Sequence, residues 1–148
     1  MQSLCGITFD RDRKRPDRVD NEAKGCLDDV ALTLNRETSD KLVIIGSHAD
    51  KETNRDSAVR AMNAAEYLTK EKGIDPARLD LRIGPDNGRT VALMLAPPGA
   101  VVDSAAATSF DTSTVKRNGQ AYGTAKAKQA PQKTVTPRAK KPKPITTF

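Results

Sequence analysis

The sequence predicts an α/β two-layer sandwich over residues 1–99, with the element order β-α-β-α-β-β and a mixed sheet. Two stretches, 20–36 and 56–72, repeat apolar residues at the spacing of a helix that buries one face. Short apolar segments typical of strands lie before, between and after these stretches. A domain of this size is large enough to fold around its own core.

The first strand is predicted at residues 4–9, LCGITF, and the charged segment 10–18 after it is interpreted as a solvated connection. The first helix is predicted at residues 20–36, with Asp20 or Asn21 as a suitable N-cap. Its apolar residues recur at intervals of three and four along one face, which comprises Val19, Ala23, Cys26, Leu27, Val30, Ala31 and Leu34.

The chain contains two cysteines, Cys5 and Cys26. Cys26 lies on the apolar face of the first helix and therefore points toward the sheet. If the first strand lies under that helix, Cys5 is within reach of Cys26. We favour a disulfide between them, which would imply an oxidising compartment, over the alternative of two buried thiols.

The next elements are a buried strand and a second helix. The strand is predicted at residues 41–46, KLVIIG, whose continuous apolar centre is typical of a central strand covered on both faces. The helix is predicted at residues 56–72, with Asp56 or Ser57 as its cap and Gly73 beyond its end. A stripe of mostly small residues permits close packing on the sheet and consists of Ala58, Ala61, Ala65 and Leu68.

Two further strands complete the predicted sheet. Residues 78–83 alternate between polar and apolar, and residues 90–96 form a second apolar run. Between them, Asn87-Gly88 is a strong turn signal. We therefore expect these last two strands to form an antiparallel pair. The strands at 41–46 and 78–83 flank a helix and should be parallel through a right-handed crossover.

The net charge of +6 belongs to the end of the chain. Residues 100–148 form a low-complexity tail rich in Lys, Pro and Ala and carry a net charge of +7, whereas residues 1–99 carry −1. We interpret residues 116–148, which lack acidic residues, as a disordered and solvated extension. The alternative is contact with anionic polymers or lipid headgroups, which salt would weaken.

The composition argues against several classes of function. Five aromatic residues and a nearly neutral domain make nucleic-acid binding unlikely. One histidine, His48, and two cysteines cannot fill a structural zinc site without carboxylates, and no nucleophile–base pair or phosphate loop is visible. We therefore expect no enzyme activity, no metal and no cofactor. The sequence has no apolar run of the ~20 residues that a transmembrane helix needs.

A spaced set of residues follows the strand KLVIIG. The strand runs into His48-Ala49-Asp50, and the remaining members of the set are Asn54, Ser57, Arg60-Ala61, Tyr67-Leu68 and Gly73-Ile74. This pattern resembles the OmpA-like domain of cell-envelope proteins, including the peptidoglycan-associated lipoproteins. The resemblance covers residues 5–96 and implies the same α/β fold.

The resemblance also implies a function, the non-covalent binding of peptidoglycan through the diaminopimelate residue of its stem peptide. In that family the Asp of the His-Ala-Asp motif pairs with the ligand's ammonium group, and the Arg of the Arg-Ala motif pairs with its carboxylate. These roles fall on Asp50 and Arg60, and His48, Asn54 and Ser57 are further candidate contacts. The implied location is the periplasm or the outer membrane, and we expect a signal peptide to lie upstream of this chain.

The sequence departs from the family pattern around this site. The loop between Asp50 and Asn54 is shorter and lacks a glycine, and Asp56 and Val59 stand where the family usually has Leu and Arg. Two functions therefore stay open. The chain is either a peptidoglycan-binding module, or a structural or interaction domain of a larger secreted envelope protein that kept the fold and lost ligand binding.

The candidate site residues also have plainer interpretations. Asp50 can cap a turn after its strand. Arg60 can pair on the helix surface with Asp56, four residues earlier. Asn54 and Ser57 can serve as turn and cap residues. The sequence alone leaves these alternatives open.

Overall fold

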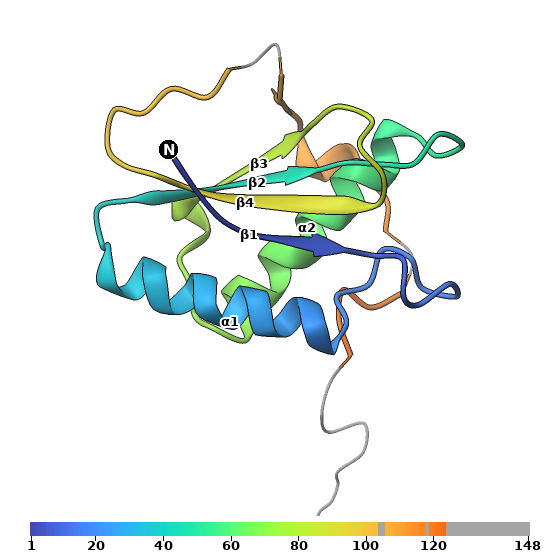
Figure 1. The fold of residues 1–148 in the computed structure, drawn as a ribbon, viewed down its shortest axis with the longest axis horizontal. Coiled ribbons are helices and arrows are strands. Elements are labelled where there is room, and N and C mark those ends of the chain that lie inside the picture. Colours follow the sequence, from blue (N-terminus) through green and yellow to red (C-terminus); the bar gives the residue numbers. More distant parts are fainter. Residues whose placement is uncertain (104–105, 118, 124–148) are drawn as a thin grey trace, which may run out of the picture.

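The computed structural model describes residues 1–103, 106–117 and 119–123, in which two helices lie against a five-stranded sheet (Figure 1). The elements are β1 (Gln2–Thr8), α1 (Asn21–Arg36), β2 (Lys41–Gly46), α2 (Asn54–Lys70), β3 (Leu79–Ile83), β4 (Thr90–Ala96) and β5 (Thr108–Ser109), with short 3-10 helices at Pro76–Arg78 and Thr112–Thr114. Within this part of the chain, neither long helix is apolar enough to cross a membrane.

The sheet is mixed, with the strand order β1-β4-β2-β3-β5. β2 and β3 are parallel, as predicted. The predicted pairing of the last two long strands is wrong, because β4 lies between β1 and β2 and is antiparallel to both. Gly88 does adopt the positive φ of a turn, at 75°. However, the whole connection from Gly84 to Arg89 is long enough to carry the chain across the end of β2.

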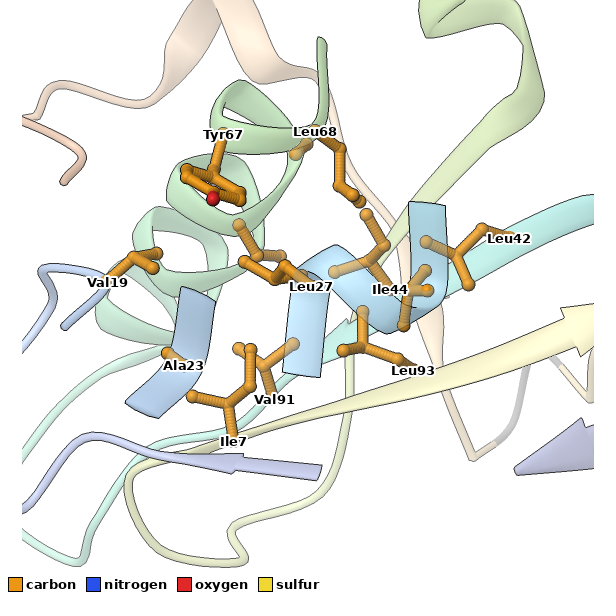
Figure 2. Packing of buried hydrophobic residues seen from close by; sticks show 14 of the residues in the cluster. Ile7, Val19, Ala23, Leu27, Leu42, Ile44, Tyr67, Leu68, Val91 and Leu93 are labelled. Carbon is orange, nitrogen blue, oxygen red and sulfur yellow. The ribbon is translucent and has the colours of Figure 1, made fainter. Parts of the chain in front are cut away.

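Both helices cover the same face of the sheet and enclose one hydrophobic core (Figures 1 and 2). Leu27 of α1 and Leu68 of α2 meet Ile44 and Leu93 of the central strands, and each of these side chains is fully buried. This arrangement confirms the predicted two-layer sandwich.

A disulfide joins Cys5 of β1 to Cys26 of α1, as predicted, with 6.2 Å between their Cα atoms. β1 is an edge strand of the sheet, and its only neighbour among the described strands is β4. The disulfide therefore gives this edge strand a covalent attachment to the helical layer.

The two helices begin differently from one another. Asp20 caps α1, and its side chain accepts a hydrogen bond from the backbone N–H of Ala23, as predicted. The predicted cap of α2 is wrong, because the helix begins at Asn54 with Thr53 as its N-cap. Asp56 lies inside the first turn, where its carboxylate accepts a hydrogen bond from the backbone N–H of Thr53 at 2.9 Å. Aspartate is common both at the N-cap and at the third position of a helix, so the sequence alone does not distinguish the two positions.

The packed chain continues past residue 99. Residues 106–117 and 119–123, called the C-terminal strap here, bring Ala107, Ala121 and Tyr122 into buried positions. Tyr122 forms a parallel β-bridge with Val19, and its ring meets the Tyr67 ring edge-on at 5.3 Å. The disorder predicted for residues 116–148 is wrong at Ala121 and Tyr122, because both are buried. Residues 118 and 124–148 fall outside the described residues.

Candidate functional site

All five predicted ligand-binding residues lie where β2 ends and α2 begins. The helix lies so close to the end of the strand that only glycine fits at residue 46. A Cβ atom added to Gly46 would lie 2.0 Å from the backbone oxygen of Ser57. The carboxyl end of a parallel strand is the usual ligand edge of an α/β sheet. The structure therefore brings the candidate residues to a position suited to binding.

Arg60 is completely buried and is held by hydrogen bonds on all three of its nitrogens. Its Nε donates to the backbone oxygen of Pro16 at 3.2 Å, and its Nη1 donates to the backbone oxygen of Ser47 at 3.1 Å. Nη1 and Nη2 also donate to the two carboxylate oxygens of Glu52, at 2.8 and 2.7 Å. The Phe9 ring lies beside the guanidinium, with its centroid 5.9 Å away.

Glu52 is the main partner of this buried arginine. Besides Arg60, it accepts hydrogen bonds from the backbone N–H of Ala49 at 2.9 Å and from Nε of Arg89 at 3.0 Å. These donors, led by the Arg60 guanidinium, lower the pKa of Glu52 to about 2. Glu52 is therefore ionised at neutral pH, and the pair with Arg60 is a full ion pair.

A second carboxylate approaches Arg60 from the loop before α1. Asp17 Oδ1 lies 3.0 Å from Nη2 of Arg60, yet no hydrogen bond within the described residues satisfies this oxygen. Burial raises the pKa of Asp17, and the charge of Arg60 opposes that rise. Carboxylate oxygens of Asp17, Glu52 and Asp56 lie within 4.8 Å of one another, a spacing that could suit a metal ion. Here the buried Arg60 already supplies a positive charge to this cluster.

The other predicted residues occupy the loop and the start of α2. His48 Nδ1 lies 2.9 Å from Oγ of the buried Ser57, so Ser57 holds the imidazole and does not cap the helix. Asn54 is the first residue of α2 and is exposed. Asp50 is also exposed, and its carboxylate makes no hydrogen bond or ion pair with the described residues.

The structure corrects two sequence-based interpretations. Arg60 does not pair with Asp56 on the helix surface, because it is buried against Glu52 and Asp17. The segment 10–18 is more than a solvated connection. The backbone oxygen of Pro16 accepts from Arg60, and that of Asp17 accepts from Nδ2 of Asn63 at 2.7 Å.

Sequence reasoning missed three residues of the site, Asp17, Glu52 and Arg89. The only sequence signal for Glu52 was its place in the shortened loop, two residues after the His-Ala-Asp motif. Asp17 and Arg89 come from connections remote in sequence from this loop, and no local pattern links them to it.

The described residues form a two-layer α/β domain with a polar cluster at the carboxyl end of β2. No family model matches the sequence, and no curated protein matches it. Among solved structures, the chain is similar to the OmpA-like domain of FopA1 from Francisella tularensis subsp. tularensis SCHU S4. The TM-score is 0.51 at 16% identity, over 62% of this chain and 71% of that chain. This likeness confirms the expected OmpA-like fold.

Proposed function

We propose that this protein is a non-catalytic cell-envelope module that binds peptidoglycan non-covalently through its stem peptide, at the diaminopimelate residue. The observation that carries the proposal is the exposed Asp50 carboxylate at the carboxyl end of β2, in an OmpA-like fold, next to the network of Arg60. The resemblance of the sequence motif to the peptidoglycan-binding family supports the same function.

Asp50 is suited to accept the ammonium group of the ligand. It is exposed, and hydrogen bonds between a carboxylate and an ammonium group are among the stronger kinds. His48, held by Ser57, and the exposed Asn54 offer further polar contacts beside it. The expected role of Arg60, pairing with a ligand carboxylate, requires Glu52 to leave the guanidinium first.

The disulfide supports an envelope location. Disulfides persist in oxidising compartments such as the periplasm and are rare in the cytosol. The seven basic residues among residues 124–148 lie outside the described part of the chain. Attraction of this tail to anionic envelope polymers or lipid headgroups therefore stays a prediction.

The test is retention of the protein on purified sacculi, one preparation with diaminopimelate and one with lysine in its stem peptides. We expect the unmodified chain to be retained and Asp50→Asn to lose about tenfold or more of its binding, because an amide cannot pair with an ammonium charge. Asp29→Asn, at an exposed position on α1, is the matched control. Equal retention of all three proteins would refute the role of Asp50.

A second function is favoured by the occupied guanidinium of Arg60. An interaction domain of a larger secreted envelope protein, with the OmpA-like fold but without ligand binding, would retain an internal Glu52–Arg60 pair for stability alone. This alternative predicts no retention of the unmodified chain on either preparation of sacculi. Retention that depends on Asp50 excludes it.

A further inference from the structure

The hydrogen-bonding capacity of Arg60 is nearly used up within the chain. A guanidinium has five N–H donors. Four hydrogen bonds go to Pro16, Ser47 and the two oxygens of Glu52, and the Asp17 carboxylate lies 3.0 Å from the remaining side of Nη2. With no exposed surface, Arg60 has no free edge for a ligand.

Glu52 contacts Arg60 in the manner of an incoming carboxylate. The two parallel hydrogen bonds, at 2.8 and 2.7 Å, form the bidentate geometry with which arginine recognises a free carboxylate group. The side chain comes from the loop between β2 and α2, at the site itself. Glu52 therefore occupies the position that a ligand carboxylate would need.

Replacing Glu52 by a ligand carboxylate would be unfavourable. The exchange substitutes one carboxylate for another on Arg60, so it yields no additional hydrogen bond there. It also breaks the bonds that Ala49 N–H and Arg89 Nε donate to Glu52. If Glu52 stays, a second carboxylate beside it meets a like charge at short range, which disfavours binding.

We propose that Glu52 is the specificity-determining residue of this site, an internal carboxylate that selects a diamino acid bearing a free ammonium group and no free side-chain carboxylate. Lysine and amidated diaminopimelate are ligands of this class. The inference rests on the proposed function, because it concerns the same stem-peptide site, and it reassigns Arg60 from ligand contact to the positioning of Glu52.

The test compares three synthetic stem peptides that differ only at the third residue, which is meso-diaminopimelate, its monoamide or L-lysine. Binding to the full chain is measured by titration calorimetry. We expect the monoamide and lysine peptides to bind at least about tenfold more tightly than the peptide with the free carboxylate. Asp50→Asn is expected to weaken the binding of all three, since each carries the same ammonium group.

Glu52→Gln is expected to reduce the tenfold preference to less than about threefold, because it removes the like charge and frees part of Arg60. Glu37→Gln is the matched control, since Glu37 is exposed beyond the end of α1 and should keep the original ratio. If the Glu52 variant does not fold, the test rests on the unmodified chain. There the measured ratio of the affinities for the monoamide or lysine peptide and for the free-carboxylate peptide shows whether the predicted preference exists.

Equal binding of the three peptides, or tighter binding of the free-carboxylate peptide, would overturn the inference and leave the proposed function standing. Binding of none of the peptides, together with no retention on sacculi, would overturn both.

Discussion

Arg60 carries its positive charge with no exposed surface. Burying a charge is unfavourable unless hydrogen bonds and opposite charges replace the lost water. The replacements come from the loop before α1 and from Ser47 and Glu52 in the loop that follows β2. Arg60 therefore fixes the loops of the candidate site relative to one another, independently of any ligand.

Replacing Arg60 with Met should destabilise the fold by about 3 kcal/mol or more, because it leaves the partly buried Glu52 and Asp17 without their cation. The measurement is the free energy of unfolding in urea. Arg36→Met, at the exposed end of α1, is the control for a lost surface arginine. A loss for Arg60→Met as small as that of the control would contradict the structural role of the buried pair.

Glu52 makes the stability of the protein depend on pH. Its pKa in the folded protein is about 2, below its ordinary value of 4.5. Because the pKa is lower in the folded chain than in the unfolded chain, ionised Glu52 stabilises the fold. This stabilisation is complete when the pH is above the pKa of the unfolded chain, and it is lost as the pH falls from about 4.5 toward 2. We expect Glu52→Gln to have a shallower decline in unfolding free energy across this window than the unmodified chain. Parallel declines in urea titrations would contradict the assignment.

The residues of the site were predictable to different degrees. His48, Asp50, Ser57 and Arg60 could be placed at one sheet edge from sequence, because a buried strand running into a helix fixes where they lie. The partner of Arg60 could not be predicted, since helical spacing offers Asp56 and only the path of the loop brings Glu52 to the guanidinium. Partner choice among several nearby acids depends on tertiary geometry.

At the scale of elements, the order of the strands shows what a local signal can and cannot establish. The Asn87-Gly88 turn was recognisable, but a turn does not determine which strands pair. The composition of the strands is more informative. β4 is apolar on both faces and is central, whereas Asp80 and Arg82 alternate along β3, which pairs on its outer side with only the two-residue β5. A strand that is apolar on both faces belongs at the centre of a sheet.

The disulfide between β1 and α1 should contribute substantially to stability. Its cysteines are 21 residues apart, and closing a loop of that length in the unfolded chain corresponds to about 3 kcal/mol. We expect the double variant Cys5→Ser with Cys26→Ser to lose roughly that amount, measured by urea unfolding under oxidising conditions. Adding a thiol reductant should lower the unfolding free energy of the unmodified chain but not that of the variant. A reductant effect of equal size on both would contradict this account.

At the scale of the whole molecule, the boundary expected at residue 99 does not coincide with the end of the packed chain. The change of composition there was real, but a few well-placed apolar residues suffice to attach the C-terminal strap. Tyr122 is one of the anchoring side chains. Its hydroxyl donates to Glu71 at 2.8 Å, and its ring packs against Tyr67. Average composition over a segment does not report on a single anchoring side chain.

Truncation tests this contribution. A chain ending at residue 123 should have an unfolding free energy, measured in urea, about 3 kcal/mol or more above that of a chain ending at residue 99. The reason is that the shorter chain loses the buried Ala107, Ala121 and Tyr122. Tyr122→Ala in the longer chain should account for much of the difference. Equal stability of the two truncated chains would show that the C-terminal strap adds nothing to the fold.

The position of β4 between β1 and β2 has a consequence for the order in which the parts of the chain can fold. β1 is made first, yet its described neighbour in the sheet, β4, follows only after both helices and two further strands. Contacts between segments so far apart in sequence slow folding, because a long loop must close before they form. Until residues 90–96 have joined the sheet, β1 has no neighbour among the described strands to pair with. Oxidation of Cys5 and Cys26 is then the one covalent means of holding β1 beside α1 while it waits.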